Sequence, residues 1–224
     1  MLLAIPGVLM PDEIQLVGEL LRDARLVDGR LSAGAAARRV KHNQELQVPE
    51  ADLERLNRVV MGALMRHPAY RAGALPRHVA SPSYVRYETG MAYGPHLDDP
   101  IMGVGAAIYR SDVAVTVFLT PPQAYDGGEL SVRTAFGVQS VKLEAGDAVL
   151  YPAGSLHHVA PVTRGERLVA VTWVQSLVRD AAQRELLFGL NAAREALLKK
   201  APDSGETAQV NAAYMNLMRM WSEL

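Results

Sequence analysis

The sequence predicts a mainly β domain with helices on both flanks. Between residues 80 and 176, short runs rich in valine, threonine and aromatic residues alternate with glycine and proline, a pattern typical of an antiparallel sandwich or barrel. Before and after this region, apolar residues recur at helical spacing instead. A hydrophobic content of 49% with 21% charged residues is ordinary for a globular protein, and 224 residues suffice for a substantial core.

The first part of the chain, residues 1–79, is expected to support the β core. Apolar side chains at helical spacing predict an amphipathic helix over residues 11–26, with Pro11 at a favourable first-turn position. Residues 27–48 are polar and rich in glycine and alanine, which favours loops with short strands. A second helix is predicted over residues 50–65. Its apolar stripe consists of Leu53, Leu56, Val60 and Leu64.

The central part, residues 80–176, supplies the strands of the core. The predicted strands are Tyr84 to Glu88, Ala114 to Leu119, Glu129 to Arg133, Val138 to Leu143, Ala148 to Tyr151 and Arg167 to Val174. Tight turns are expected at Asp126-Gly127-Gly128 and Ala145-Gly146-Asp147. The segment from Asp99 to Ser111 contains glycine and has no clean period, so we expect a mobile loop there.

The last part, residues 177–224, is predicted to be a small helical region. Ser176 is a suitable N-cap for a helix that runs to about Lys200, and the chain then breaks at Pro202-Asp203-Ser204-Gly205 before a second helix. One face of this second helix carries Val210, Tyr214, Leu217 and Trp221. Such a helical hairpin packs on the core or on a second subunit, so the pattern is compatible with a homodimer.

Charge and composition exclude several classes of function. Lys and Arg total 23 against 24 acidic residues, so no net charge favours nucleic acid or an anionic membrane as a partner. The absence of cysteine excludes disulfides, thiolate nucleophiles and zinc–thiolate sites. We find no basic signal-peptide start and no apolar run of about 18 residues, so we expect a cytoplasmic protein.

Three residues are candidates for one metal ion. His96 and Asp98 lie two apart in Tyr93-Gly94-Pro95-His96-Leu97-Asp98, and on a strand they would point to the same side. His157 follows a strand and a turn, in Ser155-Leu156-His157, and a β core can return it to His96. Two imidazoles and one carboxylate suit non-haem Fe(II) and leave three adjacent positions, which can accept a bidentate 2-oxo acid and dioxygen.

The neighbouring His158 is the alternative to His157, since alternation allows only one of the two to face the interior. A three-residue hairpin loop at Thr163-Arg164-Gly165, with Gly165 in the left-handed conformation, would pair Arg167 with Pro161 and favour His157. A two-residue loop would favour His158. We therefore predict His157, on the position of the glycine.

Arg167 is the candidate for binding the 2-oxo acid. It shares the odd-numbered face of its strand with Val169, Val171 and Trp173, and a guanidinium in an apolar row needs an anion. A planar carboxylate matches its fork with two hydrogen bonds. The alternative is an arginine at a strand entrance paired with the surface acid Glu166. Tyr87 and Tyr93 could each donate a hydrogen bond to the 2-oxo acid, although core packing explains both equally well.

The sequence resembles the iron(II)- and 2-oxoglutarate-dependent dioxygenases of the prolyl-4-hydroxylase type, and among them the bacterial PKHD-type hydroxylases. Besides the histidine and aspartate motifs, the likeness covers Ile5-Pro6-Gly7-Val8-Leu9, Val27-Asp28-Gly29-Arg30, Tyr125-Asp126-Gly127-Gly128-Glu129-Leu130, Leu150-Tyr151-Pro152, Pro161-Val162-Thr163-Arg164-Gly165 and Trp221-Ser222-Glu223. It therefore extends over nearly the whole chain.

The resemblance implies a double-stranded β-helix, or jelly roll, with His96, Asp98 and His157 as ligands of Fe(II) and Arg167 on the distal carboxylate of 2-oxoglutarate. It also implies a small C-terminal helical region, L-ascorbate as the reductant that keeps iron ferrous, hydroxylation with release of succinate and CO2, and a connection with iron uptake. The substrate stays unidentified: Lys41, Asn43, Gln44 and the segment from Asp99 to Ser111 are expected to line the entrance, and these side chains do not distinguish a peptidyl proline from a small molecule.

Two alternatives remain open from the residues alone. Gly146 to His157 also satisfies the second half of a cupin signature, which would make the protein an isomerase or a metal-dependent small-molecule binder. Cupins usually begin with His-x-His followed by glutamate, whereas this chain has His-x-Asp. The other alternative is a metal-free interaction module, which would have no use for three converging ligands and a buried arginine.

Overall fold

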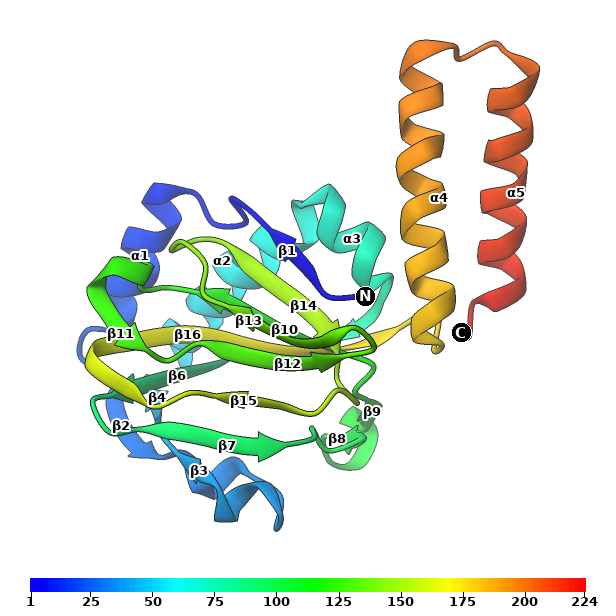
Figure 1. Ribbon diagram of the computed structural model, residues 1–224. Coiled ribbons are helices and arrows are strands. Elements are labelled where there is room, and N and C mark those ends of the chain that lie inside the picture. The colour runs from blue at the N-terminus through cyan, green and yellow to red at the C-terminus, as the bar shows by residue number, and fades with distance from the viewer.

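The computed structural model describes residues 1–224 and contains two antiparallel sheets that face each other (Figure 1). The larger sheet has the order β1 (Leu3–Ile5), β14 (Ala148–Pro152), β10 (Val113–Phe118), β16 (Val162–Ser176), β6 (Ser83–Glu88), β4 (Gln44–Gln47) and β2 (Arg25–Asp28). Two further strands, β5 (Pro76–Val79) and β11 (Tyr125–Gly127), also pair with β16. The smaller sheet has the order β13 (Gly137–Val141), β12 (Leu130–Thr134), β15 (His157–Val159), β7 (Ala92–His96) and β3 (Lys41–His42). The predicted β core is confirmed.

Side-chain alternation on β10 divides the core into two layers. Val113, Val115 and Val117 join the apolar cluster beneath the helices, whereas Ala114 and Phe118 join the cluster between the two sheets. All six residues of this strand are buried, as expected for a central strand covered on both faces. The inner layer lies between the sheets, and the site described below opens within it.

Three helices cover the outer face of the larger sheet (Figure 1): α1 (Pro11–Leu21), α2 (Glu50–Arg66) and α3 (Pro68–Ala74). The predicted second helix is confirmed, and its stripe residues Leu56, Val60 and Leu64 are fully buried. The first helix ends earlier than predicted, because residues 25–28 leave the helical path to pair with β4. The short helix α3 was not predicted.

The C-terminal region is a hairpin of α4 (Ala181–Lys200) and α5 (Gly205–Trp221) that stands away from the body of the molecule (Figure 1). The break before α5 is confirmed, but the predicted N-cap Ser176 is wrong, because β16 continues through that residue. Asp180 caps α4 instead, where its carboxylate accepts a hydrogen bond from the amide of Gln183 at 2.8 Å. None of the helices is long and apolar enough to cross a membrane.

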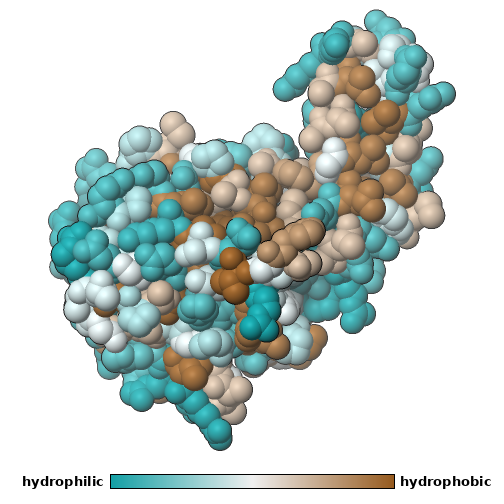
Figure 2. Space-filling model, viewed as in Figure 1, coloured by the Kyte–Doolittle hydropathy of each residue, from teal (hydrophilic) through white to brown (hydrophobic).

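The hairpin exposes apolar side chains on both helices, and Figure 2 shows apolar residues gathered along it on one face. The largest exposed ones are Leu186, Leu198, Met215 and Met220. The face of α5 predicted to be apolar packs inward only in part, with Tyr214, Leu217 and Trp221 against the small cluster at the base of the hairpin. The homodimer stays a prediction, which light scattering of the purified protein tests directly.

Candidate functional site

The structure brings His96, Asp98 and His157 together at one end of the space between the sheets. β7 and β15 are neighbours in the smaller sheet, and their register places His157 opposite His96. One candidate ligand atom of each of the three residues lies within 4.8 Å of the others. The Nε2 atom of His157 is 3.8 Å from Oδ1 of Asp98, and the two imidazole centroids are 4.2 Å apart.

Both imidazoles are oriented by the backbone. Nδ1 of His96 donates to the carbonyl of Gly94 at 2.8 Å, and Nδ1 of His157 donates to the carbonyl of Ser155 at 2.9 Å. Each ring therefore keeps Nε2 free as a ligand. Burial, reinforced by the neighbouring His157, lowers the pKa of His96 to about 4, so this ring is neutral at physiological pH.

The carboxylate completes a donor set that fits a divalent metal. The side chain of Asp98 is 8% exposed, and its Oδ2 atom is buried without a hydrogen-bond partner. Burial raises the pKa of Asp98, whereas the adjacent His157 acts in the opposite direction. A nearby cation would satisfy both the buried carboxylate and the free imidazole nitrogens. Two nitrogens and one oxygen on one side of an ion are the facial arrangement typical of non-haem Fe(II).

The turn argument that favoured His157 was wrong, although His157 does face inward. Arg167 pairs with Tyr87 of β6, not with Pro161, and Gly165 pairs with Tyr125 of β11 within a continuous strand. No three-residue hairpin loop exists at residues 163–165, although Gly165 does have a positive φ of 75°. The pairing of β15 with β7 and β12, rather than that turn, directs His157 into the pocket and leaves His158 outside its lining.

This difference predicts the behaviour of two adjacent variants. His157→Ala removes a free Nε2 atom, so we expect Mn(II) affinity to fall by more than about 100-fold, beyond the loss typical of an outer-shell change. His158→Ala should bind Mn(II) like the wild type, because its ring does not line the pocket. Electron paramagnetic resonance of free Mn(II) measures both affinities. Equal losses in the two variants would contradict this assignment.

The three residues lie in a pocket of about 440 Å³ between the sheets. Of the residues expected at its entrance, Lys41 and Asn43 line it, and Gln44 does not. The segment after Asp98 contributes Asp99, Ile101, Met102 and Gly103. Instead of an irregular loop, this segment contains a short hairpin of β8 (Ile101–Met102) and β9 (Tyr109–Arg110).

Arg167 lies in the same pocket and has no anionic partner. The residue is 2% exposed, and its Nε atom is buried without a hydrogen-bond acceptor. Glu166, the partner in the alternative interpretation, forms its ion pair with Arg86 at 2.9 Å instead. The guanidinium carbon of Arg167 lies 5.0 Å from the ring centroid of Tyr87. A buried guanidinium of this kind is costly unless an anion binds it.

The two tyrosines of the sequence prediction occupy different places. Tyr87 is buried and lies directly opposite Arg167 on the neighbouring strand, and burial raises the pKa of its phenol, which keeps it a hydrogen-bond donor. Tyr93 stacks on His96, with centroids 3.6 Å apart and an interplanar angle of 13°. Tyr87 is therefore placed beside the guanidinium, and Tyr93 beside the imidazole.

The sequence interpretation missed the role of Gly128 beside Arg167. The sequence pattern assigned Gly128 only to a turn, and its φ of 68° agrees with a turn conformation. A Cβ atom at this position would lie 3.0 Å from Cγ2 of Val162 and 3.1 Å from both Cδ of Arg167 and Cε2 of Tyr125. The phenol oxygen of Tyr125 is itself buried and without a partner. The glycine thus makes room for the arginine and for this second phenol.

We predict that Gly128→Ala weakens 2-oxo acid binding without loss of Mn(II) binding. The new methyl group would press on Arg167, and we expect the dissociation constant for 2-oxoglutarate, measured at saturating Mn(II), to rise about 10-fold. Gly90→Ala is the matched control, since Gly90 has a φ of 87° but a Cβ there meets nothing within 4 Å. If both variants weakened 2-oxoglutarate binding equally, backbone strain rather than contact with Arg167 would be the cause.

Comparison with known families assigns two parts of the chain. Residues 82–175 match the 2OG-Fe(II) oxygenase superfamily, and residues 181–223 match the PKHD-type hydroxylase C-terminal domain. A PKHD-type hydroxylase of Thioalkalivibrio sulfidiphilus is 50% identical over 224 residues, which cover 100% of both chains. A PKHD-type hydroxylase of Paracoccus denitrificans is 43% identical over 227 residues, again covering 100% of both.

Solved structures support the fold. A prolyl-4-hydroxylase of Pseudomonas putida superposes with a TM-score of 0.54 at 21% identity, covering 78% of this chain and 92% of that one. A prolyl hydroxylase of Trichoplax adhaerens, in complex with a hypoxia inducible factor peptide fragment, gives a TM-score of 0.57 at 18% identity, covering 83% of this chain and 86% of that one. The expected double-stranded β-helix core is confirmed.

Proposed function

Because this chain belongs to the PKHD-type hydroxylases of the 2-oxoglutarate- and iron(II)-dependent oxygenases, we propose that His96, Asp98 and His157 bind its Fe(II) and that Arg167 binds its 2-oxoglutarate. Family membership makes it a 2-oxoglutarate-dependent hydroxylase. The observation that carries the residue assignment is a buried guanidinium without an anionic partner, in the same pocket as three converging metal ligands.

Arg167 would fix one end of 2-oxoglutarate. Its planar fork accepts the distal carboxylate with two parallel hydrogen bonds, and the surrounding apolar residues strengthen that contact by excluding water. Tyr87 and Tyr125 are protonated phenols next to the guanidinium and can donate to the same carboxylate. The other end of the co-substrate would then point toward the metal ligands.

The bound Fe(II) supplies the oxidising chemistry, in which 2-oxoglutarate and dioxygen yield succinate and CO2 while a substrate C–H bond becomes C–OH. The chain's own residues supply position and a shielded pocket. Tyr93 stacks on His96 and limits the movement of that ring. Tyr151 contacts the ring of His157 edge-on, with centroids 5.1 Å apart, and limits the movement of that second ring. We infer that the substrate enters beside Lys41 and β8, both of which line the pocket.

Three finer predictions of the resemblance belong to this proposal: hydroxylation of a substrate with release of succinate, support of turnover by L-ascorbate, and a connection with iron uptake. The first two are tested together. Purified protein with Fe(II) and 2-oxoglutarate should form succinate under air but not under nitrogen, and ascorbate should increase the number of turnovers before inactivation.

The substrate requires a separate experiment. Incubation of the enzyme with a cell extract under ¹⁸O₂, followed by mass spectrometry, should reveal products that gain one labelled oxygen. The His157→Ala variant serves as the control for background oxidation. If succinate forms in the purified system but no labelled product appears, the extract lacks the substrate; if the wild type and His157→Ala form equal amounts of succinate, the proposed role of His157 is wrong.

A further inference from the structure

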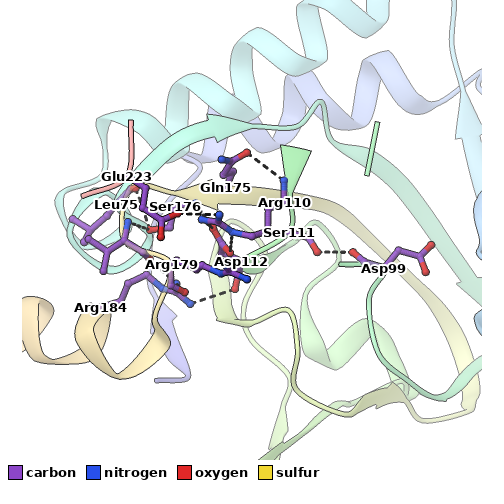
Figure 3. Close-up of polar contacts among 11 residues, drawn as sticks. Leu75, Asp99, Arg110, Ser111, Asp112, Gln175, Ser176, Arg179, Arg184 and Glu223 are labelled. Carbon is purple, nitrogen blue, oxygen red and sulfur yellow. Dashed lines mark hydrogen bonds and ion pairs between the residues drawn. The ribbon is translucent and has the colours of Figure 1, made fainter. Parts of the chain in front are cut away.

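A network of polar contacts joins the C-terminal region to the base of the β8–β9 hairpin (Figure 3). The carboxylate of Asp112 accepts from Nε of Arg110 at 2.6 Å and from the amide of Ser176 at 2.9 Å. Nη1 of Arg110 also pairs with Glu223 at 3.0 Å, and the amide of Glu223 donates to the carbonyl of Leu177 at 2.7 Å. Arg110 therefore connects the β8–β9 hairpin with the residues that follow α5.

Arg184 of α4 anchors the same network from the helical side. It is 4% exposed, and its guanidinium donates to the carbonyls of Val178, Arg179 and Asp112 at 2.8, 2.7 and 3.3 Å. These three carbonyls satisfy a charge that would otherwise be costly to bury. The base of α4 is thus held against the backbone at Asp112, as Figure 3 shows.

The network continues to the segment that carries a proposed iron ligand. The hydroxyl of Ser111, which is 8% exposed, donates to the carbonyl of Asp99 at 2.5 Å, and the amide of Ser111 donates to the carbonyl of Pro100 at 3.0 Å. Asp99 directly follows Asp98. Asp99 therefore lies between Asp98 and this anchored base, and the other pocket residues of the segment, Ile101, Met102 and Gly103, directly follow the anchored Pro100.

We propose that Arg110, Ser111 and Asp112 are positioning residues through which the C-terminal helical region holds Asp98 and the pocket wall that follows it. This inference rests on the proposed function of Asp98 as an iron ligand. It assigns the C-terminal region to the catalytic unit, since the hairpin of helices fixes one side of the metal site. Arg167 lies on β16, whose last residue Ser176 contacts Asp112, but it lies nine positions earlier in that strand, where it pairs with Tyr87 of β6.

The central test compares Ser111→Ala with Thr172→Val. Thr172 is also buried, its hydroxyl donates to the carbonyl of Ala80 at 2.6 Å, and it does not line the pocket. Both variants lose one buried hydroxyl bond to a backbone carbonyl and should have similarly lowered Tm values. Only Ser111→Ala should lose Mn(II) affinity, by about 10-fold. In both, the 2-oxoglutarate dissociation constant at saturating Mn(II) should stay within about twofold of wild type.

A second pair of variants tests the contact with the chain end. Glu223→Gln removes the ion pair to Arg110 and should weaken Mn(II) binding about threefold. Glu185→Gln is the matched control. Glu185 also belongs to the C-terminal region, and it pairs with the N-terminal amine of Met1 at 2.9 Å, so its loss should have no effect on Mn(II) binding. Hydrogen–deuterium exchange of residues 99–111 in metal-free protein should accelerate in Ser111→Ala and Glu223→Gln only.

The outcomes separate this inference from the proposed function. If Mn(II) did not bind to the wild type at a site for which Fe(II) competes, the metal site itself would be refuted. If the wild type binds Mn(II) but Ser111→Ala matches Thr172→Val in affinity and exchange, the positioning role is refuted and the metal site stands. A parallel loss of Mn(II) and 2-oxoglutarate binding in Ser111→Ala would indicate general loosening of the pocket and would also overturn the inference.

Discussion

His96→Ala should abolish iron binding and, with it, turnover of 2-oxoglutarate. Nε2 of this ring is the ligand nitrogen that β7 offers to the site, and the contact of Nδ1 with the carbonyl of Gly94 orients the ring. Two of three ligands would remain, which we expect to lower Fe(II) affinity by more than about 100-fold. Wild-type protein mixed anaerobically with Fe(II) and 2-oxoglutarate should show a weak visible charge-transfer band, and the variant should show none.

The control for this experiment is His78→Ala, which removes an exposed histidine outside the pocket. It should keep the band and the rate of succinate formation. A band that persists in His96→Ala would mean that Fe(II) binds elsewhere. Absence of the band in the wild type would instead favour a protein that does not chelate 2-oxoglutarate at iron.

The convergence of His96, Asp98 and His157 could be predicted from sequence, because side-chain alternation is set by the local backbone. Residues two apart on extended backbone share a face, and this predicted that His96 and Asp98 would converge even though β7 ends at His96 and Asp98 lies two residues beyond it. The same periodicity placed Arg167, Val171 and Trp173 on one face, and all three line the pocket. The period of side-chain alternation is a property of the backbone, and tertiary structure does not alter it within a regular strand.

The elements that escaped prediction lack that periodicity. β7 contains Gly94-Pro95, which reads as a turn, and β15 has only three residues. The argument from Thr163-Arg164-Gly165 failed because glycine indicates a positive φ but not its cause. A Cβ at Gly165 would lie 2.2 Å from the carbonyl of Ala124, so the close approach of another strand, rather than a hairpin turn, requires the glycine there.

The polar network around Asp112 could not be predicted from the sequence either. Charged residues at a helix start and at a strand start usually face solvent, and no local pattern indicates that Asp112 and Arg184, which are 72 positions apart, come into contact. A buried charge can be recognised only after its acceptors are known. For Arg184 these are backbone carbonyls, which carry no sequence signal at all.

Arg167→Met should remove 2-oxoglutarate binding while leaving metal binding intact. Methionine fills most of the volume between Tyr87 and Phe118, so it avoids a cavity, but it offers nothing to a carboxylate. Loss of one partner of a buried charged pair costs about 2–5 kcal/mol, so the dissociation constant should rise by about 30-fold to several thousand-fold. Mn(II) affinity in the absence of 2-oxoglutarate should be unchanged, because the guanidinium is not a ligand.

The stability of the same variant distinguishes a lost contact from a lost fold. In the protein without co-substrate, Arg167 is a buried charge with no anionic partner, so its replacement by an apolar side chain should leave Tm unchanged or raise it. Addition of 2-oxoglutarate with Mn(II) should then raise the Tm of the wild type, because the ligand binds only the folded state, but not that of Arg167→Met. Arg167→Lys, which keeps the charge but not the fork, should fall between the two. Equal loss of metal and co-substrate binding in Arg167→Met would show that the guanidinium supports the site as a whole rather than the carboxylate.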